Sequence, residues 1–163
     1  MRFYYINDQY IDFLTQYETK VAANKHETRP YVGIVLEINS VKYYAPFTSP
    51  KPKHKSMKNM KDFRKIKNGE YGAINFNNMI PVADEALILI DIPHLSDVKY
   101  RRLLENQYSA ICADAVEIKA TAQKLRNLIF TKDELLSNYD KVVKQRCCNL
   151  PLLEGVYRNW RLK

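Results

Sequence analysis

The sequence predicts an α+β fold in which a curved antiparallel β-sheet is covered by helices. Runs rich in β-branched and aromatic residues dominate the chain up to residue 92. From Ser96 onward, apolar residues recur every three to four positions, which is typical of amphipathic helices, so the C-terminal half is predicted to be mostly helical. Because no repeat, linker or low-complexity tract interrupts the chain, we expect residues 1–163 to form one domain.

The first elements are a strand and a helix. Phe3–Ile6 is apolar and aromatic, which predicts a strand. Asp8 is a candidate cap for a helix whose apolar residues recur every three positions and which ends near Thr19. Lys20–Arg29 is polar and predicts a loop.

A β-hairpin follows, and it is the strongest local pattern in the sequence. "YVGIVLEI" (Tyr31–Ile38) and "VKYYAPF" (Val41–Phe47) are both rich in β-branched and aromatic residues. They are separated only by Asn39 and Ser40, which favour a two-residue turn. Further along, "YGAINFNNMIPV" and "EALILIDI" predict two more strands, and the asparagine pair in the first of them marks a turn or bulge.

The second half of the chain predicts helices. Asp97 lies in the first turn of a long helical pattern that ends near Phe130, where its carboxylate favours the helix dipole. Thr131–Glu134 has the spacing of a capping box, so another helix is expected to begin there. A last short helix is predicted after Pro151.

Positive charge is concentrated in one stretch, Lys51–Lys67, which we call the basic segment. It contains eight basic residues and one acid, so it carries +7 of the chain's net charge of +8. A localised charge of this kind, with a pI near 9.3, indicates a polyanionic partner, either nucleic acid or anionic lipid.

Several classes of function lack their signatures. The three cysteines have no CxxC spacing, which indicates a reducing cytoplasm, and no apolar run approaches the roughly 20 residues of a membrane span. We therefore expect a soluble cytoplasmic protein that does not contact the membrane. With four glycines and no P-loop, GxGxxG, HExxH or GxSxG motif, nucleotide hydrolysis and zinc proteolysis are not indicated. The three histidines do not cluster, so we expect no bound metal and no cofactor.

The stretch "TSPK", Thr48 to Lys51, closes the predicted hairpin and has two interpretations. It can be a turn stabilised by the Thr48 and Ser49 hydroxyls and by Pro50, with Lys51 in solvent. Alternatively, two hydroxyls and an ammonium group converge there on a phosphodiester. Such a site needs no metal if the attacking group is the 2′-hydroxyl of RNA, because the substrate then supplies its own nucleophile.

The basic segment also has two interpretations, since charge runs are often only solvated faces. Its apolar residues recur every three positions, which predicts a short helix over Met57–Lys67 that packs on the sheet and presents its cations to RNA phosphates. Tyr43, Tyr44 and Tyr71 are candidates for base stacking, although strand tyrosines more often pack in a core. The predicted RNA contacts are Lys53, Lys55, Lys58, Lys61, Arg64, Lys65, Lys67 and Tyr44.

Taken in order, "RFYYINDQYIDFL", "YVGIVLEI", "KYYAPFTSPK" and "INFNNMIPV" closely resemble the ToxN/AbiQ family of type III toxin–antitoxin endoribonucleases. The resemblance covers most of the first 92 residues. It implies a small barrel-like core related to the MazF and Kid toxins and metal-independent RNA cleavage that leaves a 2′,3′-cyclic phosphate and a 5′-hydroxyl. It also implies inhibition by a small repeat-derived pseudoknot RNA that the toxin cuts from a precursor, and a role in abortive infection of phage-infected cells.

The resemblance also implies site residues. The family's Thr-Ser-Pro-Lys element falls on Thr48–Lys51. A family lysine falls on Arg29, which keeps the charge but cannot usefully exchange a proton. A family tyrosine falls on Lys25, whose role is left open.

These residues define a mechanistic hypothesis. Thr48 and Ser49 orient the scissile phosphate and the 2′-hydroxyl, while Arg29 and Lys51 stabilise the pentacoordinate charge and Lys51 assists proton transfer. The alternatives are a non-catalytic RNA-binding module that uses the basic segment and a toxin that acts on DNA gyrase, which leaves the lysines unexplained.

Overall fold

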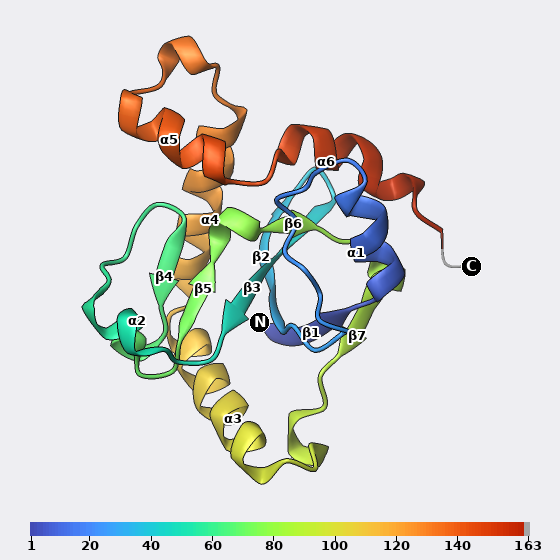
Figure 1. The fold of residues 1–163 in the computed structure, drawn as a ribbon, viewed down its shortest axis with the longest axis vertical. Coiled ribbons are helices and arrows are strands. Elements are labelled where there is room, and N and C mark those ends of the chain that lie inside the picture. The colour runs from blue at the N-terminus through green and yellow to red at the C-terminus, as the bar shows by residue number, and fades with distance from the viewer. Residues whose placement is uncertain (162–163) are drawn as a thin grey trace.

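The computed structural model describes residues 1–161 and contains one antiparallel sheet with helices packed on it (Figure 1). The strands follow the order β4-β5-β3-β2-β1-β7, and the short β6 pairs with β3. The strands are β1 (Arg2–Ile6), β2 (Tyr31–Ile38), β3 (Val41–Thr48), β4 (Phe63–Lys65), β5 (Ala73–Asn75), β6 (Ile80–Pro81) and β7 (Leu87–Leu89).

The hairpin β2–β3 is confirmed and forms the centre of the sheet. Asn39 and Ser40 have φ angles of 50° and 61°, as a two-residue primed turn requires, and they leave Ile38 paired with Val41. β3 pairs with β2 from Val41 to Pro46 and with the short β6 at Tyr43 and Tyr44. Its far end, at Phe47 and Thr48, pairs with β5.

The expected antiparallel sheet with helices is confirmed, but a MazF/Kid-like barrel core is not, because the sheet remains open. Within residues 1–161 the two terminal strands, β4 and β7, each pair with a single neighbour and not with each other. Each of these two strands has three residues.

Six α-helices accompany the sheet in the described residues, and four of them lie after residue 96, in the half predicted to be mostly helical. Figure 1 shows α3 and α4 running one after the other along one side, with α5 at the far end of α4. The helices are α1 (Asp8–Thr15), α2 (Pro52–Ser56), α3 (Val98–Ala113), α4 (Ala115–Phe130), α5 (Asn138–Arg146) and α6 (Leu150–Val156). Short 3-10 turns span Lys67–Gly69, Phe76–Asn78, Asp84–Ala86, Ile92–His94, Asp133–Leu135 and Tyr157–Asn159.

Two helices begin at other residues than expected, because a different side chain caps each of them. Asn7, not Asp8, caps α1 by accepting the Gln9 amide, and the helix ends at Thr15. In the predicted capping box after α4, Thr131 ends that helix, while Asp133 and Glu134 lie in a 3-10 turn. α5 begins later, where Ser137 accepts the Asp140 amide.

The core lies between the sheet and the helices α4 and α6. α4 places a stripe of Ile118, Ala122, Leu125 and Ile129 against the sheet, each at most 4% exposed. This spacing is the period of an α-helix, so the sequence pattern and the packed face agree. No helix among residues 1–161 has the length and apolar content needed to cross a membrane.

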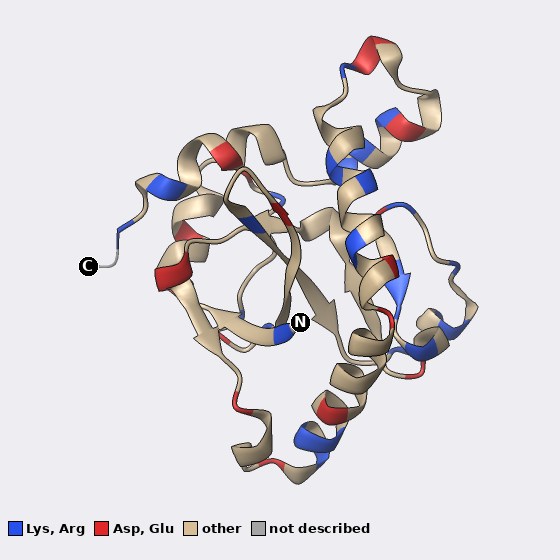
Figure 2. Ribbon diagram, turned by 180° about the vertical axis from the view of Figure 1, so that it is seen from behind, with Lys and Arg blue, Asp and Glu red and all other residues tan. Residues whose placement is uncertain are grey.

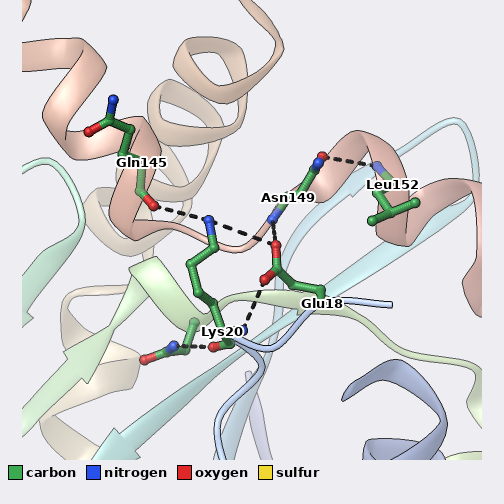
Figure 3. A network of polar contacts seen from close by, with 6 residues as sticks. Glu18, Lys20, Gln145, Asn149 and Leu152 are labelled. Carbon is green, nitrogen blue, oxygen red and sulfur yellow. Dashed lines mark hydrogen bonds and ion pairs between the residues drawn. The ribbon is translucent and has the colours of Figure 1, made fainter. Parts of the chain in front are cut away.

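A buried carboxylate joins the loop after α1 to the segment between α5 and α6 (Figure 3). Glu18, 7% exposed, accepts the Asn149 amide at 2.8 Å and the Lys20 amide at 2.9 Å. Lys20 in turn donates from Nζ to the Gln145 carbonyl at 3.0 Å. The loop after α1 therefore fixes the link between α5 and α6.

Candidate functional site

The "TSPK" stretch lies where β3 ends and α2 begins. Thr48 is the last residue of β3, and Lys51 is the N-terminal cap of α2, with extended φ and ψ of −129° and 149°. Ser49 and Lys51 are exposed, whereas Thr48 is half-buried. Two prolines, Pro50 and Pro52, flank Lys51 and restrict the chain as it leaves the sheet.

Neighbouring backbone packs closely against this stretch. Thr48 pairs with Ala73 of β5, and the residue before Ala73 is Gly72, with φ of 99°. A Cβ atom at Gly72 would lie 1.9 Å from the Thr48 carbonyl oxygen, so only glycine permits this approach.

A buried amide from α3 holds the same strand ends. Gln107 is 1% exposed, and its Nε2 donates to the Tyr71 carbonyl at 2.7 Å and to the Thr48 carbonyl at 3.3 Å. Sequence reasoning missed this residue. Its signal is a polar side chain at a core position of the helix, between the buried residues Leu104 and Ile111.

The hydroxyl of Thr48 differs from that of Ser49. Its Oγ1 is buried and has no hydrogen-bond partner among the described residues. An unpaired buried hydroxyl destabilises a fold by about 1–3 kcal/mol, so this side chain gains if it turns outward to a ligand. Ser49 needs no such movement.

Arg29 borders the site through its backbone. The next residue, Pro30, accepts the Phe47 amide at 3.1 Å, so the start of β2 lies beside the end of β3. The Arg29 side chain, half-buried, donates from Nε to the Ala23 carbonyl at 2.6 Å. Its guanidinium is thus anchored to its own loop, while Lys25 in that loop is exposed.

His54 is buried, contrary to its polar sequence surroundings. It is 3% exposed, and its Nδ1 accepts the backbone N–H of Lys51 at 3.2 Å. Its pKa is lowered, mainly by burial and then by the positive charges of Lys51 and Lys53. The sequence signal for this contact is a histidine three residues after the cap residue Lys51, with a proline at the first position of the helix.

The basic segment is not the helix that was predicted over Met57–Lys67. After α2 it turns through Asn59 and Met60, with Asn59 Oδ1 accepting the Lys65 amide at 2.8 Å, and then forms β4. Met60 is 39% exposed, so the three-residue apolar spacing did not mark a packed face. A helix here would also place lysines three and four positions apart, where like charges repel.

The predicted cationic contacts fall into two groups. Lys61 is paired with Asp140 at 2.5 Å and Arg64 with Asp114 at 2.7 Å, which ties the basic segment to α5 and to the α3–α4 junction. The others have no carboxylate within 4.0 Å in residues 1–161, and all but the half-buried Lys65 are exposed: Lys53, Lys55, Lys58, Lys65 and Lys67. Figure 2 shows the basic residues along α2 and the loop that follows it.

Tyr44, one of the predicted RNA contacts, is buried and cannot stack on a base in this structure. Its side chain is 2% exposed and packs edge-on against Tyr4, with ring centroids 5.4 Å apart. Tyr43 is also buried, and its hydroxyl accepts a hydrogen bond from Arg126. Tyr71, half-buried, is the one of the three candidates with an accessible side chain.

The site presents the Ser49 hydroxyl and lysine ammonium groups to solvent at the end of β3. The backbone there is held by contacts with Gly72 and Gln107. In residues 1–161, no three His, Cys, Asp or Glu side chains converge in a way that could hold a metal ion. The chemistry available to the exposed groups is the orientation and charge stabilisation of a phosphate.

Comparison with known proteins places these features in a family. Residues 2–158 match the family model described as toxin ToxN of type III toxin–antitoxin systems. The endoribonuclease ToxN of Pectobacterium atrosepticum is 33% identical, with 98% of this chain and 94% of that protein covered. The endoribonuclease ToxN of Bacillus thuringiensis subsp. kurstaki is 32% identical, with 94% and 80% covered.

Solved structures share the fold over nearly the whole chain. A structure from work on selective toxin inhibition by a non-coding RNA pseudoknot in type III systems has a TM-score of 0.86 and 28% identity, with 99% of this chain and 98% of that chain covered. A second, from work on a processed non-coding RNA that regulates a bacterial antiviral system, has a TM-score of 0.82 and 30% identity, with 99% and 100% covered.

Proposed function

The chain belongs to the ToxN family of type III toxin–antitoxin toxins, and we propose that it is an endoribonuclease that cuts RNA without a metal ion. A small antitoxin RNA, folded as a pseudoknot from a repeat, is its inhibitory partner, and the toxin cuts that RNA from its precursor. Cellular or phage RNA is its target, and the cytoplasm its place of action. Because the family model spans nearly the whole chain, we treat residues 1–163 as one toxin domain.

The observation that supports this proposal best is the family's Thr-Ser-Pro-Lys element at a braced strand end. Ser49 and Lys51 are exposed there, while Gly72 and Gln107 fix the backbone behind them. Rigid support of this kind is what a transition state requires, since misplacing a reacting group by about 1 Å can slow a reaction about 10²-fold.

The reaction we propose is an internal transesterification. The 2′-oxygen attacks the adjacent phosphorus as its proton leaves, the bond from phosphorus to the 5′-oxygen breaks, and that oxygen takes up a proton. The products are a 2′,3′-cyclic phosphate and a 5′-hydroxyl. Ser49 orients the phosphate, Lys51 stabilises the added negative charge and serves in proton transfer, and Arg29 contributes positive charge from the start of β2.

Thr48 acts only when its hydroxyl turns outward from its buried position. The exposed lysines of the basic segment bind the flanking phosphates, which would release counterions and make binding depend on salt.

The test is cleavage of single-stranded RNA by the purified protein in excess EDTA, with analysis of the product ends. We expect cleavage with cyclic phosphate and 5′-hydroxyl termini. Activity that requires added Mg²⁺ or Mn²⁺ would refute metal independence. Binding of RNA without cleavage under any of these conditions would instead favour a non-catalytic RNA-binding module.

A further inference from the structure

Lys51 has an unusual backbone environment. Because it lies between Pro50 and Pro52, its amide is the only backbone N–H in that run of three residues. This amide donates to Nδ1 of His54 at 3.2 Å, and the Lys51 carbonyl accepts the His54 amide at 2.9 Å. The two bonds close a turn around Lys51 and fix the direction in which its side chain leaves the backbone.

The ring and the backbone of His54 are each packed against another part of the chain. Its ring centroid lies 6.0 Å from that of Phe63 on β4. A Cβ atom at Gly69 would lie 2.6 Å from the His54 backbone carbonyl oxygen, so the 3-10 turn at Lys67–Gly69 packs directly on the backbone of α2. A residue that is 3% exposed and packed in this way has little freedom to move. His54 can therefore hold the Lys51 backbone in one position.

The hydrogen bond requires one protonation state. A ring nitrogen accepts a bond only when it carries no proton, so His54 must be neutral with its proton on Nε2. Burial and the charges of Lys51 and Lys53 lower its pKa, and Phe63, the ring that packs beside it from β4, carries no charge. The acceptor therefore persists at pH values where an ordinary histidine becomes charged.

We propose that neutral His54 is a positioning residue of the active site, whose Nδ1 holds the Lys51 amide and thereby places the Lys51 ammonium beside Ser49. This inference rests on the proposed endoribonuclease function. It assigns a role to a residue that contacts no substrate and that acts only through the backbone of Lys51.

Three substitutions separate this role from simple packing. His54→Asn keeps an acceptor, Oδ1, at the same number of bonds from the backbone as Nδ1. His54→Gln moves the acceptor one bond further out, and His54→Phe keeps a ring beside Phe63 without any acceptor. In single-turnover cleavage of bound RNA, we expect the Asn variant within about threefold of wild type and the Gln and Phe variants about 10- to 10²-fold slower. RNA affinity should stay within about twofold in all three, because the phosphate-binding lysines are intact.

A pH–rate profile distinguishes positioning from proton transfer. If His54 only positions Lys51, the Asn variant keeps the shape of the wild-type profile. If His54 exchanged protons with the substrate, the Asn variant would lose one limb of the profile and would be as slow as the Phe variant. The latter result would overturn the proposal, as would a Phe variant that is folded by circular dichroism and cuts at the wild-type rate.

Nitrogen-15 NMR of the wild-type protein tests the hydrogen bond without any activity measurement. We expect the His54 signals of a neutral ring protonated on Nε2 at pH 7, and protonation on Nδ1 would overturn the proposal. Should the wild-type protein fail to cut RNA, the proposed function and the positioning role fall together, whereas the NMR result still stands for the bond itself.

Discussion

The hydroxyl and ammonium groups of the "TSPK" stretch differ in what they can reach. Ser49 and Lys51 are exposed at the end of β3, whereas the Thr48 hydroxyl is buried without a partner among the described residues. The stretch could be found from the sequence because its members are contiguous. Gln107 and His54 were missed, because the spacing that marks each of them becomes informative only once its burial is known.

Replacing Ser49 or Lys51 by Ala should remove groups that act on the transition state. We expect single-turnover cleavage to fall about 10²- to 10⁴-fold for each, with only a modest change in RNA affinity. The matched controls are Ser40→Ala, in the turn at the opposite end of the hairpin, and Lys99→Ala, an exposed lysine of α3. If the controls lose as much rate as the site variants, the chemistry does not lie in this stretch.

His54 should also make stability sensitive to acid. Its pKa is lowered in the folded state from the ordinary value of 6.5, so the unfolded chain binds more protons as pH falls below that value. Its contribution to stability is present above pH 6.5 and is lost below it. Between pH 7.5 and 5.5, the thermal midpoint of wild type should fall more than that of His54→Asn, and equal falls would contradict this assignment.

At the scale of elements, the position of the candidate stretch "TSPK" is set where the end of β3 pairs with β5. The hairpin β2–β3 was predictable because two strand-forming runs are joined by two turn residues. The course of the basic segment was not, because its three-residue apolar spacing resembles a helix while Asn59 and β5 direct it into a turn and a strand. Local propensity lost to tertiary pairing there.

Gln107 joins those strand ends, and Gln107→Leu should weaken both stability and cleavage. The substitution keeps much of the side-chain volume but leaves the carbonyls of Thr48 and Tyr71 without their buried donor. An unsatisfied buried group costs about 1–3 kcal/mol, so we expect a loss of that size in urea unfolding and slower cleavage at saturating RNA. The control is Gln123→Leu on α4, whose side-chain amide, among the described residues, bonds to Asn127 on the same helix. Wild-type stability and rate in the Gln107→Leu variant would show that the bridge is not needed.

At the scale of the whole molecule, part of the architecture was predictable from the sequence and part was not. The helical half and the order of the elements were predictable from periodicity, but whether the sheet closes was not, because closure depends on strand lengths that the sequence does not mark. The ion pairs of Lys61 and Arg64 were also beyond prediction, since their partners lie 79 and 50 residues away.

Neutralising Lys53, Lys55, Lys58 and Lys67 by Gln should weaken RNA binding. These lysines have no acidic partner within 4.0 Å among residues 1–161, so we expect the slope of log affinity against log salt to fall by about 0.7 per lost phosphate contact with single-stranded RNA. Bound RNA should still be cut. A variant with the same change in net charge, at Lys99, Arg102, Lys119 and Lys132, should keep its slope. Equal slopes for the two variants would mean that the basic segment is only a solvated surface.

We propose that the RNA supplies its own nucleophile, the 2′-hydroxyl, at the end of β3. The most direct measurement is single-turnover cleavage, in EDTA, of an RNA whose nucleotide 5′ to the cut carries 2′-deoxyribose. We expect cleavage to be abolished while binding is nearly unchanged, because the phosphates that dominate affinity remain. Cleavage of the deoxy substrate at the rate of the all-ribose RNA would contradict the claim.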